Sequence, residues 1–129
     1  MTENTTPTTA RASLDLWLTM WNDDSELART ICADDFRIRF GVTEADGSSP
    51  ADEIRTPDDF VAFLEFWRST HAGTVFTTVS DAIDGSHGRL LWDVESGGRI
   101  AGGVDVLDFD VDGRITRVWS VGGARSMKG

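Results

Sequence analysis

The sequence predicts a single α+β domain, in which helices from the first half of the chain lie on one face of an antiparallel sheet. Three observations support this prediction. The chain has 129 residues, a length typical of one domain. Residues 12–73 carry helical patterns around one strand pattern, and residues 74–121 carry four consecutive strand patterns divided by tight-turn signals. Helices followed by a run of strands are typical of the α+β class.

The first predicted helix covers residues 12–22, where apolar side chains recur at helical spacing. They fall at positions i, i+3, i+4 and i+7 and therefore form one stripe: Leu14, Trp17, Leu18 and Trp21. A short second helix follows, because Asp24 or Ser25 can cap its N-terminus and Leu27 and Ile31 lie on one side.

The third predicted helix has the clearest start in the chain. Thr56 can cap it, Pro57 fits its first position, and two aspartates follow at the positive end of the helix dipole. Gly73 can end it. Its buried stripe is predicted to consist of Phe60, Phe63, Leu64 and Trp67.

Five strands are predicted, one before the third helix and four after it. They lie at residues 36–41, 74–83, 88–96, 100–111 and 114–121. The last four are divided by dipeptides typical of tight turns: Asp84-Gly85, Gly97-Gly98 and Asp112-Gly113. The stretch 42–55 is rich in Gly, Ser, Pro and acids, which predicts a long loop of the kind that often serves as a lid or binding loop.

Charge and cysteine content exclude several classes of function. The net charge of −10 argues against binding to nucleic acid and to anionic membranes. No apolar run approaches the roughly 20 residues of a membrane span, and the first ten residues lack the basic and apolar parts of a signal peptide. Cys32 is the single cysteine, which excludes an internal disulfide and suits a reducing compartment. We therefore expect a cytoplasmic protein.

The stretch GGVDVLDFDVDG, residues 102–113, sets Asp105 apart from the aspartates that follow it. Side chains of a strand alternate between two faces. The three later aspartates share one face, whereas Asp105 lies on the opposite, apolar face with Leu107 and Phe109. If that face lines a pocket, burial disfavours the charged form and raises the pKa of Asp105. The alternative is a buried structural carboxyl that hydrogen-bonds to a helix backbone or an indole.

Two further residues are candidate partners of Asp105. Asp93 shares its strand face with charged neighbours, which predicts either a solvated edge or a polar pocket beside Asp105. Two carboxyls in one pocket would move their pKa values apart and yield an acid and a base at neutral pH. His71 lies near the end of the third helix, where it either caps carbonyl groups or faces the pocket. His87 lies in a turn and is expected to be exposed.

The motif DFDVDG at residues 108–113 matches the start of a calcium-binding loop. The twelfth position of such a loop needs a bidentate glutamate, and here it is Trp119. The flanking patterns are strands rather than helices, so we interpret the motif as a hairpin turn. The histidines and the cysteine lack the spacing of metal ligands, so we expect no metal site.

Two stretches, WNDDSELARTICADDF and VDVLDFDVDGRITRVWSV, resemble the nuclear transport factor 2-like superfamily. This superfamily includes ketosteroid isomerase, limonene-epoxide hydrolase, scytalone dehydratase and the SnoaL-like polyketide cyclases. The resemblance covers residues 12–123 and leaves a disordered tail at 1–11 and a C-terminal tail at 124–129. It implies a cone, in which a strongly bent antiparallel sheet wraps around the helices and encloses a pocket. It also implies a homodimer formed through the sheet, and the position of Trp119 on the outer sheet face agrees with that.

The resemblance places Asp105 where steroid isomerases keep a protonated aspartic acid that donates to the developing oxyanion. The isomerase base falls near Phe40, which cannot accept a proton, and the isomerase tyrosine falls near Trp17, whose indole only donates. Asp93 matches one aspartate of the epoxide hydrolase, but Leu91 replaces its arginine and Ser120 stands near its last-strand aspartate. Neither set of catalytic residues is complete.

We therefore expect a small enzyme without metal or organic cofactor that transfers protons on a small hydrophobic metabolite. Isomerisation, cyclisation, dehydration and epoxide opening all fit. Asp105 would be the acid or oxyanion donor, Asp93 or His71 the base, and Trp17 a second donor. The alternative is a non-catalytic module for binding small molecules or for dimerisation. The expected pocket lining is Trp17, Trp21, Phe40, Phe63, Trp67, Leu107 and Phe109.

Overall fold

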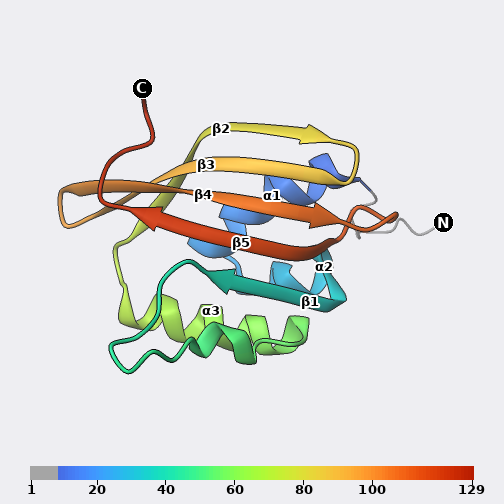
Figure 1. Ribbon diagram of the computed structural model, residues 1–129, viewed down its shortest axis with the longest axis horizontal. Coiled ribbons are helices and arrows are strands. Elements are labelled where there is room, and N and C mark those ends of the chain that lie inside the picture. The colour runs from blue at the N-terminus through green and yellow to red at the C-terminus, as the bar shows by residue number, and fades with distance from the viewer. Residues whose placement is uncertain (1–8) are drawn as a thin grey trace.

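The computed structural model describes residues 9–129 and confirms the α+β class and the predicted order of elements (Figure 1). The helices are α1 (Ala10–Asn22), α2 (Ala28–Ile31) and α3 (Pro57–Thr70), with 3₁₀ turns η1 (Ser25–Leu27) and η2 (Pro50–Glu53). The strands are β1 (Cys32–Phe40), β2 (Val75–Asp84), β3 (His87–Ser96), β4 (Arg99–Phe109) and β5 (Ile115–Gly123). In the described part of the chain, no helix is long and apolar enough to cross a membrane.

The five strands form one sheet in the order β1-β5-β4-β3-β2. Strands β2 to β5 form the expected antiparallel meander, but β1 pairs with β5 in parallel. The sheet is therefore mixed rather than antiparallel throughout. No hairpin joins β1 to β5, so turn chemistry does not dictate their relative direction, and the prediction had no local signal for it.

The structure places the starts of α1 and β1 earlier than the sequence predicted. Helix α1 begins at Ala10, because the side chain of Thr9 accepts a hydrogen bond from the backbone N–H of Ala12 at 3.0 Å. Of the predicted N-terminal tail, residues 1–8 lie outside the described residues. Strand β1 begins at Cys32, four residues before the predicted start, and an irregular register between Cys32 and Arg37 hides the strand pattern there.

Helix α3 begins as predicted. The side chain of Thr56 accepts a hydrogen bond from the backbone N–H of Asp59 at 3.1 Å, and Pro57 is the first helical residue. Along its stripe Phe60 and Leu64 are fully buried, whereas Phe63 and Trp67 are half-buried. Both half-buried side chains line a cavity.

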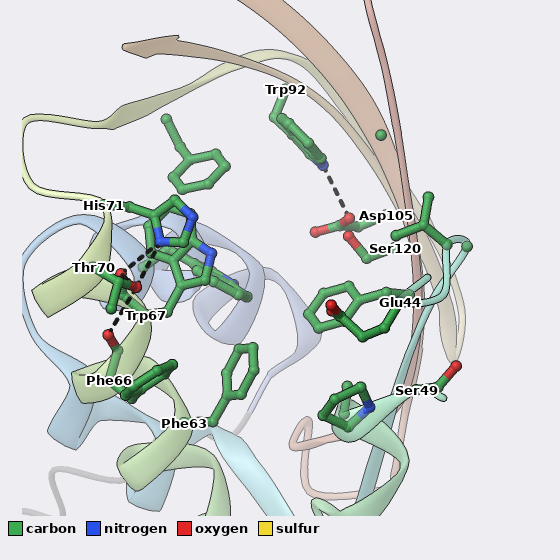
Figure 2. A pocket seen from close by; sticks show the side chains of 18 of the residues that line it. Glu44, Ser49, Phe63, Phe66, Trp67, Thr70, His71, Trp92, Asp105 and Ser120 are labelled. Carbon is green, nitrogen blue, oxygen red and sulfur yellow. Dashed lines mark hydrogen bonds between the residues drawn. The ribbon is translucent and has the colours of Figure 1, made fainter. Parts of the chain in front are cut away.

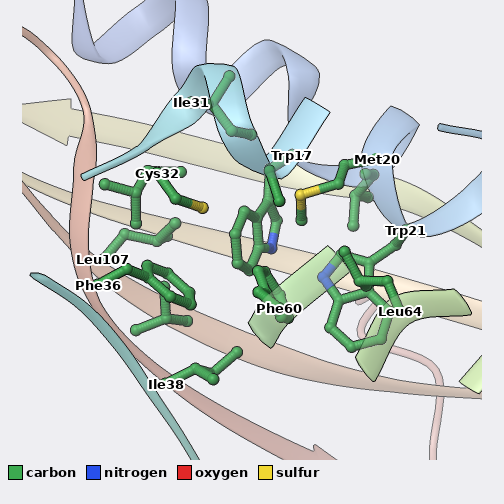
Figure 3. Packing of buried hydrophobic residues seen from close by; sticks show 14 of the residues in the cluster. Trp17, Met20, Trp21, Ile31, Cys32, Phe36, Ile38, Phe60, Leu64 and Leu107 are labelled. Atoms are coloured by element: carbon green, nitrogen blue, oxygen red, sulfur yellow. The ribbon is translucent and has the colours of Figure 1, made fainter. Parts of the chain in front are cut away.

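The core lies between the helices and the inner face of the sheet. Trp17 stands at its centre with no exposed surface and contacts Phe36 and Phe60, with ring centroids 6.4 and 5.8 Å away (Figure 3). Removing a buried aromatic of this kind costs about 3–5 kcal/mol. The fully buried side chains around it include Met20, Ile31, Ile38, Leu64, Leu90, Leu107, Ile115 and Val118.

Candidate functional site

A cavity of about 580 Å³ lies between the helices and one end of the sheet. Figure 2 shows Asp105 and Ser120 on the sheet wall, and His71 and Trp67 on the helical wall opposite. The lining is mainly aromatic, with a few polar side chains, which is typical of small-molecule sites. It consists of Leu18, Trp21, Phe40, Gly41, Val42, Glu44, Ser49, Pro50, Ala51, Phe63, Phe66, Trp67, Thr70, His71, Phe76, Trp92, Asp105, Ser120 and Gly122.

Asp105 forms part of the cavity wall and is only 3% exposed. Two indoles hold its carboxyl group, one from a helix and one from a neighbouring strand. The Nε1–H of Trp17 donates to Oδ2 at 2.8 Å, and the Nε1–H of Trp92 donates to Oδ1 at 2.9 Å. Ser120 lies directly opposite Asp105 in the β4–β5 register. Asp105 therefore bonds to indoles, as the structural interpretation expected, and also lies at the cavity wall, where the functional interpretation placed it.

Burial raises the pKa of Asp105 above its ordinary value of 3.8. Hydrogen bonds from Ser120, Trp92 and Trp17 favour the charged form and offset part of this effect. Within residues 9–129, no basic side chain forms an ion pair with this carboxyl group. The site therefore disfavours the charged carboxylate more than water does, and the carboxyl group of Asp105 stands at the cavity wall.

His71 lies at the C-terminal end of α3 and also lines the cavity. Its ring stacks on Trp67, with centroids 4.3 Å apart and an interplanar angle of 7°. Its Nδ1 lies 2.9 Å from the backbone oxygen of Trp67 and 2.9 Å from the hydroxyl of Thr70. A carbonyl oxygen only accepts, so we assign the proton of the neutral ring to Nδ1. This leaves Nε2 with a free lone pair, as a general base requires.

Asp93 does not share the cavity, and the expectation that it points in beside Asp105 is wrong. Its neighbour Trp92 lines the cavity, and strand alternation turns Asp93 to the opposite face of the sheet. The carboxylate is buried there by the C-terminal segment, where it accepts from the hydroxyl of Ser126 and the backbone N–H of Met127, each at 2.7 Å. These hydrogen bonds lower the pKa of Asp93 below its ordinary value.

Of the seven residues expected to line the pocket, Trp21, Phe40, Phe63 and Trp67 do so. Trp17, Leu107 and Phe109 do not, because they are buried in the packed core. Leu107 and Phe109 lie further along β4, away from the end of the sheet that borders the cavity. Trp17 reaches the site only through its N–H group, which is bonded to Asp105 and is therefore not a second donor to a ligand.

The sequence prediction left out most of the remaining lining, including two residues that bear on the chemistry of the site. Glu44 lies in the loop after β1, which composition had marked as a lid or binding loop, so a weak signal for it existed. Trp92 had no local signal, because its contact with Asp105 depends on the register between β3 and β4.

The aspartates of the DFDVDG motif form a hairpin turn, as predicted. The carboxylate of Asp110 accepts from the backbone N–H groups of Asp112 at 2.9 Å and Arg114 at 3.0 Å. Gly113 has φ of 81°, which L-residues with side chains rarely adopt. Across the described residues, no three His, Cys, Asp or Glu side chains lie close enough to hold a metal ion.

No family model and no curated protein matches the sequence. Solved structures do match the fold. A candidate isomerase of the SnoaL-like family from Agrobacterium tumefaciens aligns at a TM-score of 0.72 and 20% identity, over 88% of this chain and 97% of that one. A candidate ketosteroid isomerase from Kribbella flavida aligns at 0.68 and 19% identity, over 88% and 77%. IdmH, a candidate polyketide cyclase from Streptomyces antibioticus, aligns at 0.68 and 15% identity, over 88% and 91%.

The chain therefore has the nuclear transport factor 2-like fold, as its sequence resemblance implied. Proteins described as isomerases and polyketide cyclases are among the structures that share it. At identities of 20% or less in these three matches, the likeness establishes the fold, and the chemistry must be argued from the site itself.

Proposed function

We propose that this protein is a small enzyme that transfers a proton on an apolar metabolite bearing a carbonyl or epoxide group. One observation carries the proposal. A buried carboxyl group without an ion-pair partner in the described chain faces a largely aromatic cavity of about 580 Å³. An acid kept neutral in this way can stabilise negative charge that develops on a ligand oxygen.

In the proposed reaction, the substrate oxygen accepts a hydrogen bond from Asp105. The free Nε2 of His71 takes a proton from the carbon next to the carbonyl group, and negative charge moves to the bonded oxygen. Return of that proton to another carbon completes an isomerisation, and the enzyme ends in its starting state. All atoms come from the substrate and these two side chains, so the step needs no cofactor. The position of the two residues on opposite walls supports these roles (Figure 2).

Glu44 is a second candidate base. It lies on the loop side of the cavity and its side chain is exposed, so a substrate that fills the cavity would desolvate it. Comparing His71→Gln with Glu44→Gln will assign the base.

We also propose a cytoplasmic location, for which the single buried cysteine, Cys32, is the support.

The test is hydrogen–deuterium exchange at carbon, which reports proton abstraction even when the product is unknown. Apolar ketones, enones and epoxides are first ranked by the melting temperature that they induce. Compounds that bind are then incubated in D₂O with wild type and with Asp105→Asn, and deuterium incorporation is followed by NMR. Enzyme-dependent exchange that Asp105→Asn slows supports the proposal. Tight binding without exchange or conversion would instead identify a non-catalytic binding module.

A further inference from the structure

The indole of Trp92 lies over a pair of glycines. Trp92 on β3 pairs with Gly103 on β4, which pairs in turn with Gly122 on β5. A Cβ atom at Gly103 would stand 2.4 Å from Cζ2 and 2.7 Å from Cη2 of Trp92, which is closer than atoms can approach. A Cβ at Gly122 would stand 3.7 Å from Cη2, an ordinary contact. Gly103 thus leaves the space in which the indole lies against the sheet.

The position of the indole over Gly103 brings its N–H group to the carboxyl group of Asp105. The ring packs edge-on against Phe76, with centroids 5.3 Å apart at 76°, and its Nε1 lies 2.9 Å from Oδ1. A side chain at position 103 would lift the ring from the sheet and withdraw the donor. We propose that Trp92 is a positioning residue for Asp105, and that Gly103 is the residue that seats it. The inference rests on the proposed role of Asp105 as the cavity acid.

The two indole donors of Asp105 stand in different places. Trp17 belongs to the closed core and has no exposed surface, whereas Trp92 is 9% exposed and lines the cavity. A ligand therefore contacts Trp92 directly and Trp17 not at all. With each carboxyl oxygen bonded to one indole, the plane of the carboxyl group is fixed, and the neutral acid can direct its proton only away from both indoles.

The neighbouring glycine serves the other face of the sheet. A Cβ at Gly102 would stand 2.6 Å from Cγ of Met127 and 2.7 Å from Oδ1 of Asp93. The Gly-Gly pair of β4 therefore makes room on both faces, for Trp92 inside and for the C-terminal segment outside. A simple bend in the strand would not require glycine at these contacts.

Nitrogen-15 NMR of the tryptophan indoles tests the proposal without any substrate. In wild type, the indole N–H signals of Trp17 and Trp92 should move together as pH rises, with one midpoint that reports the ionisation of Asp105. His71 and Glu44 face the same cavity, and Asp105→Asn should abolish the shared midpoint and so assign it. Trp92→Phe removes a donor that favours the charged form, so the Trp17 midpoint should move to higher pH.

Gly103→Ala should move the midpoint in the same direction, because the displaced ring withdraws its N–H. Its matched control is Gly122→Ala, whose Cβ has room, and the midpoint should stay in place. Trp92→Phe keeps the test valid if Gly103→Ala does not fold, since a Cβ at position 103 would also stand 2.5 Å from the backbone oxygen of Val121. The inference is wrong if the indole N–H signal of Trp92 does not change as Asp105 ionises. It is also wrong if Trp92→Phe leaves the pH midpoint of the Trp17 signal unchanged. Because no turnover is measured, neither result depends on the proposed reaction.

Discussion

Asp93 and Asp105 lie on neighbouring strands and expose almost equally little surface, 4% and 3%, but Asp93 lies shallow beneath the C-terminal segment and Asp105 lies deep in the interior, and their pKa values shift in opposite directions. Asp93 accepts from a hydroxyl and a backbone N–H of the C-terminal segment and lies near Lys128, so its charged form is favoured. Asp105 accepts from two indoles inside the aromatic region, where the loss of water outweighs these bonds. A low exposed fraction alone therefore does not predict the direction in which the pKa of a carboxyl group shifts.

The face of the sheet separates the two roles. On the outer face, Asp93 anchors the end of the chain and makes no contact with the cavity. On the inner face, Asp105 has a donor on each oxygen and a cavity in front of it, which is the arrangement of a functional acid. Substitutions that affect one face and spare the other test this division.

The largest effect is expected from Asp105→Asn. Loss of an oxyanion donor typically lowers kcat by about 10²–10³-fold, and we expect a loss of this size in the deuterium-exchange rate. The fold should survive at a cost of about 1–3 kcal/mol at low pH, because the amide turns an NH₂ group toward one of the two indole donors. Thermal melts and exchange rates of both proteins, measured in parallel, check this.

The pH dependence of that stability difference gives the sign of the Asp105 shift. Because the folded pKa is raised, Asp105 contributes fully below its unfolded value, near 3.8, and loses this contribution as pH rises through the folded pKa. The advantage of wild type over Asp105→Asn should therefore be largest near pH 4 and shrink toward pH 8. An advantage that instead grows with pH would show an ionised, paired carboxylate and would remove the acid from the mechanism.

Local sequence signals predicted much of the fold, and they also predicted that Asp105 lies on an apolar face. The Thr56 cap and the stripe at Phe60 and Leu64 depend on neighbouring residues only, so sequence patterns located α3 correctly. Asp105 stood out because strand alternation within β4 put it among apolar side chains.

The position of Asp93 depends on pairing between distant segments, which carries no local signal. Whether Asp93 faces inward follows from the register that sets Leu90 opposite Asp105 and Asp93 opposite Gly102. The C-terminal segment that covers Asp93 has no periodicity, and the prediction treated it as a tail. The same limit explains why the parallel pairing of β1 and the contact of Trp92 were not predicted.

The next largest effect is expected from His71→Gln, which removes the proposed base from the wall opposite Asp105. Deuterium exchange should fall by about 10²-fold. Stability should change by less than about 0.5 kcal/mol, because the side chain is exposed. The matched control is His87→Gln, since His87 is exposed and pairs with Asp108 at 3.0 Å, outside the cavity. Equal losses in both variants would contradict a role for His71, and a loss confined to Glu44→Gln would move the base to the loop.

A smaller effect on turnover is expected from Asp93→Asn, within about twofold, because the residue lies on the outer face. The substitution should instead loosen residues 124–129. Trypsin cleavage after Arg125, followed by mass spectrometry, should become faster, and Ser126→Ala should have the same effect because it removes the other partner of this contact.

The pH dependence of the Asp93 contact has the opposite sign to that of Asp105. A lowered folded pKa stabilises above the ordinary value of 3.8 and loses this contribution as pH falls through the folded pKa. The difference between wild type and Asp93→Asn should therefore be full at neutral pH and vanish in strong acid. A large loss of turnover in well-folded Asp93→Asn would contradict the separation of the two faces.

The smallest effect on the cavity is expected from Trp119→Glu, which tests the proposal that two copies of the chain associate through the outer sheet face. Trp119 is 53% exposed and lies directly opposite Val106, which is 48% exposed, and the guanidinium of Arg39 stands 5.6 Å above its ring. Val121, further along β5, is 50% exposed. An exposed apolar strip of this kind, with an aromatic residue at its centre, is typical of a protein–protein contact.

Light scattering at tens of micromolar should give the mass of a dimer for wild type and a lower mass for Trp119→Glu. The free energy of unfolding should change by less than about 0.5 kcal/mol beyond the effect of lost assembly, because the side chain is not part of the core. Val111→Glu adds the same charge at a fully exposed valine in the β4–β5 turn, away from the strip, and should leave the dimer intact. A wild type that is monomeric at this concentration would refute the proposed dimer, and dissociation by both variants would show that charge rather than this surface controls assembly.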